Sequence, residues 1–68
     1  MVEVVLKDLL ENRKISRYEL AKRTGIRYQI IDNYYKNKVI RYDGYVLDRI
    51  CSAVDCEIGD ILKYNKDR

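Results

Sequence analysis

The chain has 68 residues, of which 47% are hydrophobic and 37% charged, and its formal net charge is +3 at pH 7. This length allows one small domain with a thin hydrophobic core and excludes a multi-domain enzyme or a long repeat protein. The apolar content is too high for a disordered chain, and apolar runs of two or three residues are too short to cross a bilayer. The amino terminus lacks the basic start and long apolar stretch of a secretion signal, so we expect a cytoplasmic protein.

The residue types that carry most catalytic and metal chemistry are scarce. The sequence has no histidine, and its two cysteines, Cys51 and Cys56, cannot supply the four ligands of a structural zinc site. With no nucleophile–base pair and no glycine-rich phosphate loop, we expect no enzyme, no cofactor, no metal and no small-molecule ligand. Cys51 lies in phase with an apolar helical stripe and is expected in the core as a reduced thiol. The place of Cys56 stays open. A disulfide between the two is possible, but it would stabilise the fold little, because the loop that it closes is only five residues long.

Positive charge is concentrated in the middle of the chain. Nine basic and only two acidic residues lie between Arg13 and Tyr42, whereas the remainder has five basic and nine acidic residues. This asymmetry suggests one face suited to a polyanion. An unevenly charged, solvated surface is the alternative.

The spacing of apolar residues predicts helices throughout, five in all, and no sheet. The first helix is expected from Val2 to residues 12–14. A second is expected over residues 17–24, with Ser16 as its N-cap and Glu19 completing a capping box. Gly25 can end this helix because it adopts positive φ without a Cβ penalty.

A third helix is predicted over residues 28–36, with Ile31 and Tyr34 facing inward. Asn37 is a candidate left-handed terminator. Residues 38–42 form a connection, under which Val39 and Ile40 can be buried.

The fourth helix is predicted to follow Asp43 as its cap. Its inward stripe consists of Val46, Leu47, Ile50, Cys51 and Val54. A turn at residues 55–56 leads to a fifth predicted helix, with Ile58, Ile61 and Leu62 facing inward. Residues 65–68 are expected to be a frayed tail.

Residues 17–36 have the spacing of a helix-turn-helix. Ala21 is small enough for two helices to approach closely, and Gly25, four residues later, permits a tight turn. The expected core of the motif consists of Leu20, Ala21, Gly25, Ile26, Ile31 and Tyr34.

These residues carry a resemblance to a known family. The run from Ser16 through Leu20-Ala21 and Thr24-Gly25-Ile26 to Ile31 resembles the helix-turn-helix of phage Cro and repressor (XRE-like) regulators. Residues 47–62 resemble the fourth and fifth helices of small members, so the likeness covers about residues 4–64. It implies an all-α, five-helix lambda-repressor-like fold, with residues 1–68 forming one DNA-binding domain.

The sequence departs from the family at three positions. Arg27 replaces a capping serine or threonine, Asn37 replaces a frequent glycine, and Asp32 places an acid on the expected DNA-facing surface. We expect Asp32 to pair with Lys36 at i+4.

In this motif the second of its two helices, here the one predicted over residues 28–36, lies in the major groove with its amino-terminal part against the bases. The residues expected to read bases are Arg27, Tyr28, Gln29 and Asn33. The residues expected to contact the DNA backbone are Arg17, Lys36, Lys38 and Arg41. The amides of Gln29 and Asn33 match the edge of adenine and lie on one helical face, although solvated polar side chains would explain them too.

Two functions from different classes follow. The first is a sequence-specific double-stranded DNA-binding transcriptional regulator, a repressor that occupies its operator as a weak homodimer or as a dimer formed on DNA. The second is a protein-interaction module with the same fold, antitoxin-like or an adaptor, in which exposed Tyr45 and Tyr64 would matter more than the basic segment. The concentration of charge in the motif favours the first.

Overall fold

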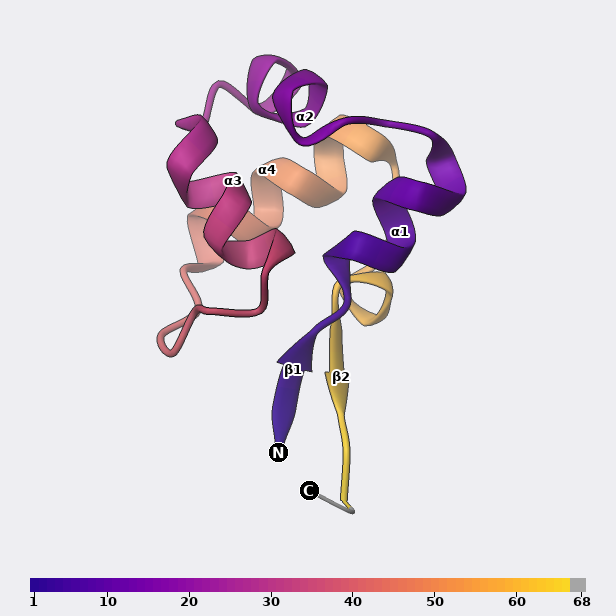
Figure 1. The fold of residues 1–68 in the computed structure, drawn as a ribbon, viewed down its shortest axis with the longest axis vertical. Helices are drawn as coiled ribbons and strands as arrows, with labels where there is room; N and C mark the ends of the chain where they lie inside the picture. Colours follow the sequence, from indigo (N-terminus) through magenta and orange to yellow (C-terminus); the bar gives the residue numbers. More distant parts are fainter. Residues whose placement is uncertain (67–68) are drawn as a thin grey trace.

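The computed structural model describes residues 1–66, and within them the chain forms four α-helices and one short pair of strands. The helices are α1 (Leu6–Arg13), α2 (Arg17–Thr24), α3 (Tyr28–Tyr35) and α4 (Gly44–Val54). The strands are β1 (Val2–Val4) and β2 (Leu62–Tyr64), and a 3₁₀ turn (Ile58–Asp60) precedes β2. The helices form the body of the molecule, and the strand pair projects from it with the amino terminus at its far end (Figure 1).

The chain begins as a strand, so the predicted start of the first helix at Val2 is wrong. Val2 pairs with Tyr64 and Val4 with Leu62 in an antiparallel ladder. The helix starts only at Leu6 and ends at Arg13, as expected. Three residues are too few to show strand alternation, and their hydrogen-bonding partners lie at the other end of the sequence.

The predicted fifth helix is also replaced, by the 3₁₀ turn and β2. Ile61 is fully buried as expected, but Ile58 is 51% exposed. The chain leaves the turn extended because β2 completes the ladder with β1. In the tail that was expected to fray, the backbone N–H of Asn65 donates to the Met1 carbonyl over 2.7 Å. Residues 67–68 lie outside the described part of the chain.

The residues expected to bound the second helix do so. The Ser16 hydroxyl accepts the Glu19 N–H at 3.0 Å, and Gly25 has φ +74° while its N–H donates to the Ala21 carbonyl. Only half of the predicted capping box forms, because the Glu19 carboxylate pairs with Arg23 Nε at 3.0 Å. The local signals for this helix and its turn are therefore confirmed.

The residues predicted to end α3 and to begin α4 also have the expected conformations. Asn37 has φ +57°, the left-handed conformation expected of it, and Asp43 caps α4 by accepting the Tyr45 N–H at 2.8 Å. The connection between them differs from expectation at Ile40, which is 90% exposed, whereas Val39 is half-buried.

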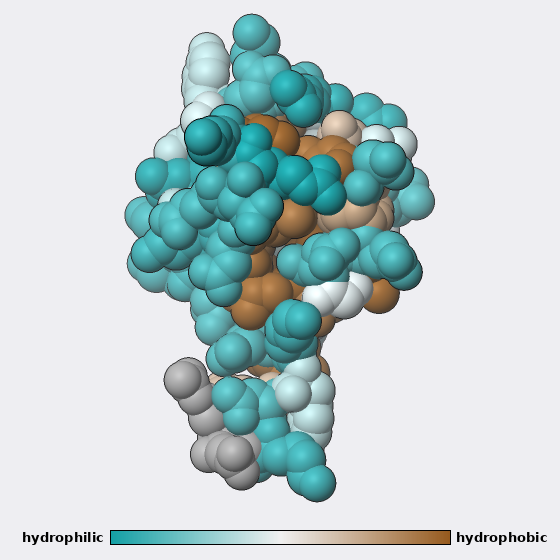
Figure 2. Space-filling model, turned by 90° about the vertical axis from the view of Figure 1, so that its right-hand side faces the viewer, coloured by the Kyte–Doolittle hydropathy of each residue, from teal (hydrophilic) through white to brown (hydrophobic). Residues whose placement is uncertain are grey.

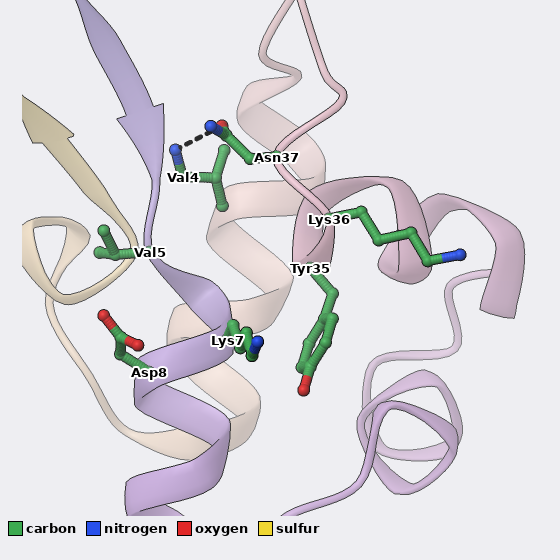
Figure 3. A pocket seen from close by; sticks show the side chains of 7 residues that line it. All are labelled: Val4, Val5, Lys7, Asp8, Tyr35, Lys36 and Asn37. Atoms are coloured by element: carbon green, nitrogen blue, oxygen red, sulfur yellow. Dashed lines mark hydrogen bonds between the residues drawn. The ribbon is translucent and has the colours of Figure 1, made fainter.

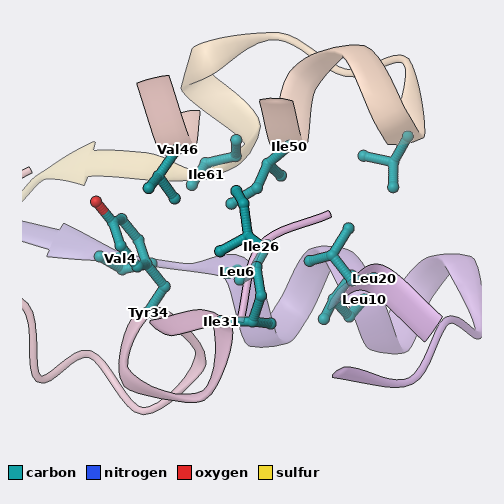
Figure 4. Close-up of a cluster of buried hydrophobic side chains, with 11 residues drawn as sticks. Val4, Leu6, Leu10, Leu20, Ile26, Ile31, Tyr34, Val46, Ile50 and Ile61 are labelled. Atoms are coloured by element: carbon teal, nitrogen blue, oxygen red, sulfur yellow. The ribbon is translucent and has the colours of Figure 1, made fainter. Parts of the chain in front are cut away.

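One hydrophobic core joins all four helices and both ends of the chain (Figure 4). Its buried members are Val4, Leu6, Leu10, Leu20, Ile26, Ile31, Tyr34, Val46, Ile50, Val54 and Ile61. Leu47, Cys51 and Leu62 pack against it while half-buried. On the face shown in Figure 2, apolar side chains occupy the centre of the body and hydrophilic ones surround them.

Candidate nucleic-acid interface

The turn between α2 and α3 is built around Thr24. Its buried hydroxyl donates to the Leu20 carbonyl at 2.8 Å and accepts the Ile26 N–H at 3.2 Å, so the turn has no unsatisfied buried group at this point. Arg49 of α4 donates from Nε and Nη2 to the Thr24 carbonyl, at 3.0 and 2.8 Å. Helix α4 thus fixes the turn from outside the motif.

The six residues expected to form the motif core fall into three groups by burial. Leu20, Ile26, Ile31 and Tyr34 are buried, Ala21 is half-buried against them, and Gly25 makes the exposed turn. The Tyr34 hydroxyl also accepts the Asp43 N–H at 3.0 Å. Together these contacts set the orientation of α3.

The amino-terminal part of α3 presents the expected base-reading side chains to solvent. Arg27, Tyr28 and Gln29 are exposed and Asn33 is half-buried. The Gln29 amide nitrogen donates to Asn33 Oδ1 at 3.2 Å, so the structure brings these two amides together. Arg27 stands at the N-cap of α3 without a side-chain capping bond, as its chemistry implies.

Asp32 is turned into the molecule and holds two basic residues. Its Oδ2 lies 3.1 Å from Lys36 Nζ, as expected, and its Oδ1 lies 2.6 Å from Arg17 Nη1. The Arg17 guanidinium also lies over the Tyr35 ring, 4.2 Å from the centroid. The pKa of Asp32 is lowered by the hydrogen bonds from Lys36 and Arg17, and the pKa of Arg17 is raised mainly by the bond to Asp32. Asp32 therefore stays ionised, and the positive charges of Lys36 and Arg17 compensate its negative charge on the expected DNA-facing surface.

The carboxyl end of α3 is tied to the first strand. Asn37 Oδ1 accepts the backbone N–H of Val4 at 2.8 Å, as the dashed line in Figure 3 shows. The sequence showed the left-handed backbone of Asn37 but not this side-chain role. Lys38 and Arg41, in the connection that follows, are both exposed.

The basic middle of the chain does not all belong to one face. Arg13 donates from Nη1 to the Val54 carbonyl and from Nη2, at 3.4 Å, to that of Asp55, at the carboxyl end of α4. It stabilises orphan carbonyls of that helix instead of contributing to the α2–α3 surface. The count of nine basic residues thus overstates the charge of the candidate interface.

A model of the Cro/C1-type HTH DNA-binding domain matches residues 5–67 of this sequence. The chain belongs to the Cro/C1-type helix-turn-helix DNA-binding family. It is 42% identical over 62 residues to the uncharacterized HTH-type transcriptional regulator YozG of Bacillus subtilis (strain 168), a match covering 87% of this chain and 70% of that protein. No solved structure matches significantly.

This membership confirms the resemblance read from the sequence. Helices α2 and α3, joined by the turn at Gly25, lie where the sequence predicted the helix-turn-helix. The domain binds DNA, and its family is not one of enzymes. Within residues 1–66, none of the helices combines the length and the apolar character needed to span a membrane.

Proposed function

We propose that this protein is a sequence-specific double-stranded DNA-binding transcriptional regulator that represses by occupying its operator. The observation that carries the proposal is the pair of amides, Gln29 and Asn33, joined on the solvent side of the second motif helix. An uncharged amide adds little to general attraction for DNA, but its paired donor and acceptor suit one base edge. The name of the Bacillus subtilis relative supports a role in transcription.

The remaining contacts divide by chemistry. Arg27 and Tyr28 flank the amides at the start of α3, where a guanidinium suits guanine or phosphate and an aromatic ring suits a thymine methyl group. Lys38 and Arg41 extend the basic surface beyond α3 and would contact phosphates. Arg17 and Lys36 would do the same from the two helices of the motif.

Two copies are proposed to act together, as a weak homodimer or as a dimer formed on DNA. One such helix reads only about four or five base pairs, and a two-fold operator doubles that information. The surface of α4 and β2 is the candidate interface, since Tyr45 and Tyr64 are 64% and 71% exposed.

Selection of bound sequences from a random double-stranded pool tests the function. We expect an enriched motif of two inverted half-sites separated by about one helical turn. The matched control is the double variant Gln29→Ala with Asn33→Ala, which keeps the net charge and should bind DNA while losing the enrichment at the base positions that the two amides read. Failure of the unmodified protein to enrich any sequence would contradict sequence-specific regulation.

A further inference from the structure

We propose that Asp32 is a positioning residue for DNA binding, which holds Arg17 and Lys36 at a fixed separation so that both engage the DNA backbone as one clamp. The inference rests on the proposed function, because it takes these two basic residues as backbone contacts. It assigns a use to the one acidic side chain on α3.

The geometry joins the two helices of the motif through a single carboxylate. Asp32 uses Oδ1 for Arg17, at the amino terminus of α2, and Oδ2 for Lys36, after the last turn of α3. Only 7% of Asp32 is exposed, so the carboxylate is set within the surface and the two cations lie outside it.

Arg17 is held from two sides. Asp32 bonds to one terminal nitrogen, and the Tyr35 ring lies under the guanidinium at 4.2 Å. A guanidinium has five N–H donors, so the bond to Asp32 leaves others available for a phosphate. The Arg17 side chain is 34% exposed and Lys36 48%, which leaves both within reach of a ligand.

Two consequences of the carboxylate oppose each other. Its negative charge reduces the attraction of this surface for DNA, which alone would weaken binding. Its bonds order two long side chains before DNA arrives, which lowers the entropy cost of binding. The proposal holds that the second effect is larger at the operator, so the sign of the change on removing the charge decides the question.

The experiment compares Asp32→Asn with Glu19→Gln in titrations of the selected operator at constant salt. Both substitutions raise the net charge by one, and both remove a carboxylate that pairs with a basic residue four positions later. We expect Asp32→Asn to weaken operator binding about 5- to 10-fold, and Glu19→Gln to leave binding unchanged or tighten it. Equal or tighter binding by Asp32→Asn would overturn the proposal.

A second variant separates positioning from a loss of stability. Arg17→Lys keeps the charge and changes only how the cation is held, so we expect it to weaken operator binding several-fold with an unchanged melting temperature. Arg17→Met should weaken operator binding when it is made in the unmodified protein. Its effect should be clearly smaller in the Asp32→Asn background, because Arg17 and Asp32 act as a unit.

These variants distinguish a failure of the positioning role of Asp32 from a failure of the proposed backbone contacts. If Arg17→Met weakens binding equally in both backgrounds, the positioning role is overturned while the backbone contact stands. If Arg17→Met and Lys36→Met leave binding unchanged although the protein still selects its operator, the proposed backbone contacts are overturned, and the clamp with them.

Discussion

The side-chain amide of Gln29 donates a hydrogen bond to the Oδ1 of Asn33, 3.2 Å away and one helical turn further along α3. Because each amide has further donors or acceptors, this bond orients both without using up their hydrogen-bonding capacity. The pair is thus a prearranged unit at the centre of the proposed base-reading surface. Each residue should affect the other's contact with a base.

Gln29→Ala and Asn33→Ala should each relax the preference at one base position. The expected cost on the selected site is about 1–3 kcal/mol for each, with little change on scrambled DNA. Since the amides orient each other, the double variant should lose less than the sum of the two. Titrations with both DNAs, together with melting curves, measure these effects.

Asn12→Ala is the matched control for those amides, because Asn12 is an exposed amide on α1. It should leave both affinities unchanged. Equal losses on both DNAs would make Gln29 and Asn33 general contacts, and a large fall in melting temperature would make them structural.

Lys38→Ala and Arg41→Ala should weaken binding to all sequences alike. Each removes an exposed cation next to α3, so the slope of log affinity against log salt should fall by about one per substitution. Titrations at several salt concentrations measure the slope. A slope that is nearly flat in the unmodified protein would favour the protein-interaction alternative.

Asn37 has two structural roles that substitutions can separate. Asn37→Gly keeps the positive φ and loses only the acceptor for the Val4 N–H, whereas Asn37→Ala also places an unfavourable residue at φ +57°. We expect Asn37→Ala to lower the free energy of unfolding by about 1 kcal/mol more than Asn37→Gly. Urea denaturation measures both, and equal losses would show that the hydrogen bond alone matters.

Cys56 should react slowly with alkylating reagents near neutral pH. Burial, and then the neighbouring Cys51, raise the pKa of the Cys56 thiol to about 11, so its thiolate is scarce at pH 7. In a Cys51→Ser variant, the rate of labelling by iodoacetamide should rise steeply with pH above 9. Rapid labelling at pH 7 would contradict a raised pKa of the Cys56 thiol.

The same shift has a consequence for stability. Because the pKa is higher in the folded than in the unfolded protein, the neutral thiol favours folding below the ordinary thiol pKa. That stabilisation should decline as the pH rises toward 11. In the Cys56→Ser variant, the free energy of unfolding should fall less steeply between pH 9 and 11 than in the unmodified protein, as urea denaturation at each pH would measure.

Much of the motif could be predicted because its signals are local. The Ser16 cap, the Gly25 turn and the inward positions Leu20, Ile26 and Ile31 all depend on neighbours within about one or two helical turns. The pairing of Asp32 with Lys36 at i+4 was predictable for the same reason. The DNA-contacting roles remain predictions, although the structure leaves the side chains that they need exposed or, at Arg17 and Asn33, half-buried.

The two wrong predictions, a helix from Val2 and a fifth helix, both concern segments whose structure depends on a distant partner. Val2–Val4 looked helical by spacing, but its partner, Leu62–Tyr64, lies some sixty residues away, and the same pairing replaced the fifth helix. The strand pair, its continuation from Asn65 to Met1 and the exposure of Ile58 all follow from that one long-range contact.

The two motif helices, the caps at Ser16 and Gly25 and the shared face of Gln29 and Asn33 follow from local sequence signals, since backbone preference and helical periodicity act over a few residues. Three contacts depend instead on tertiary packing: Arg49 anchors the motif turn, Asp32 also holds Arg17, and residues 2–4 pair with residues 62–64. Each of these contacts joins residues at least 15 positions apart. No local pattern specifies such a contact, because the partner comes within reach only when the shared core places both segments.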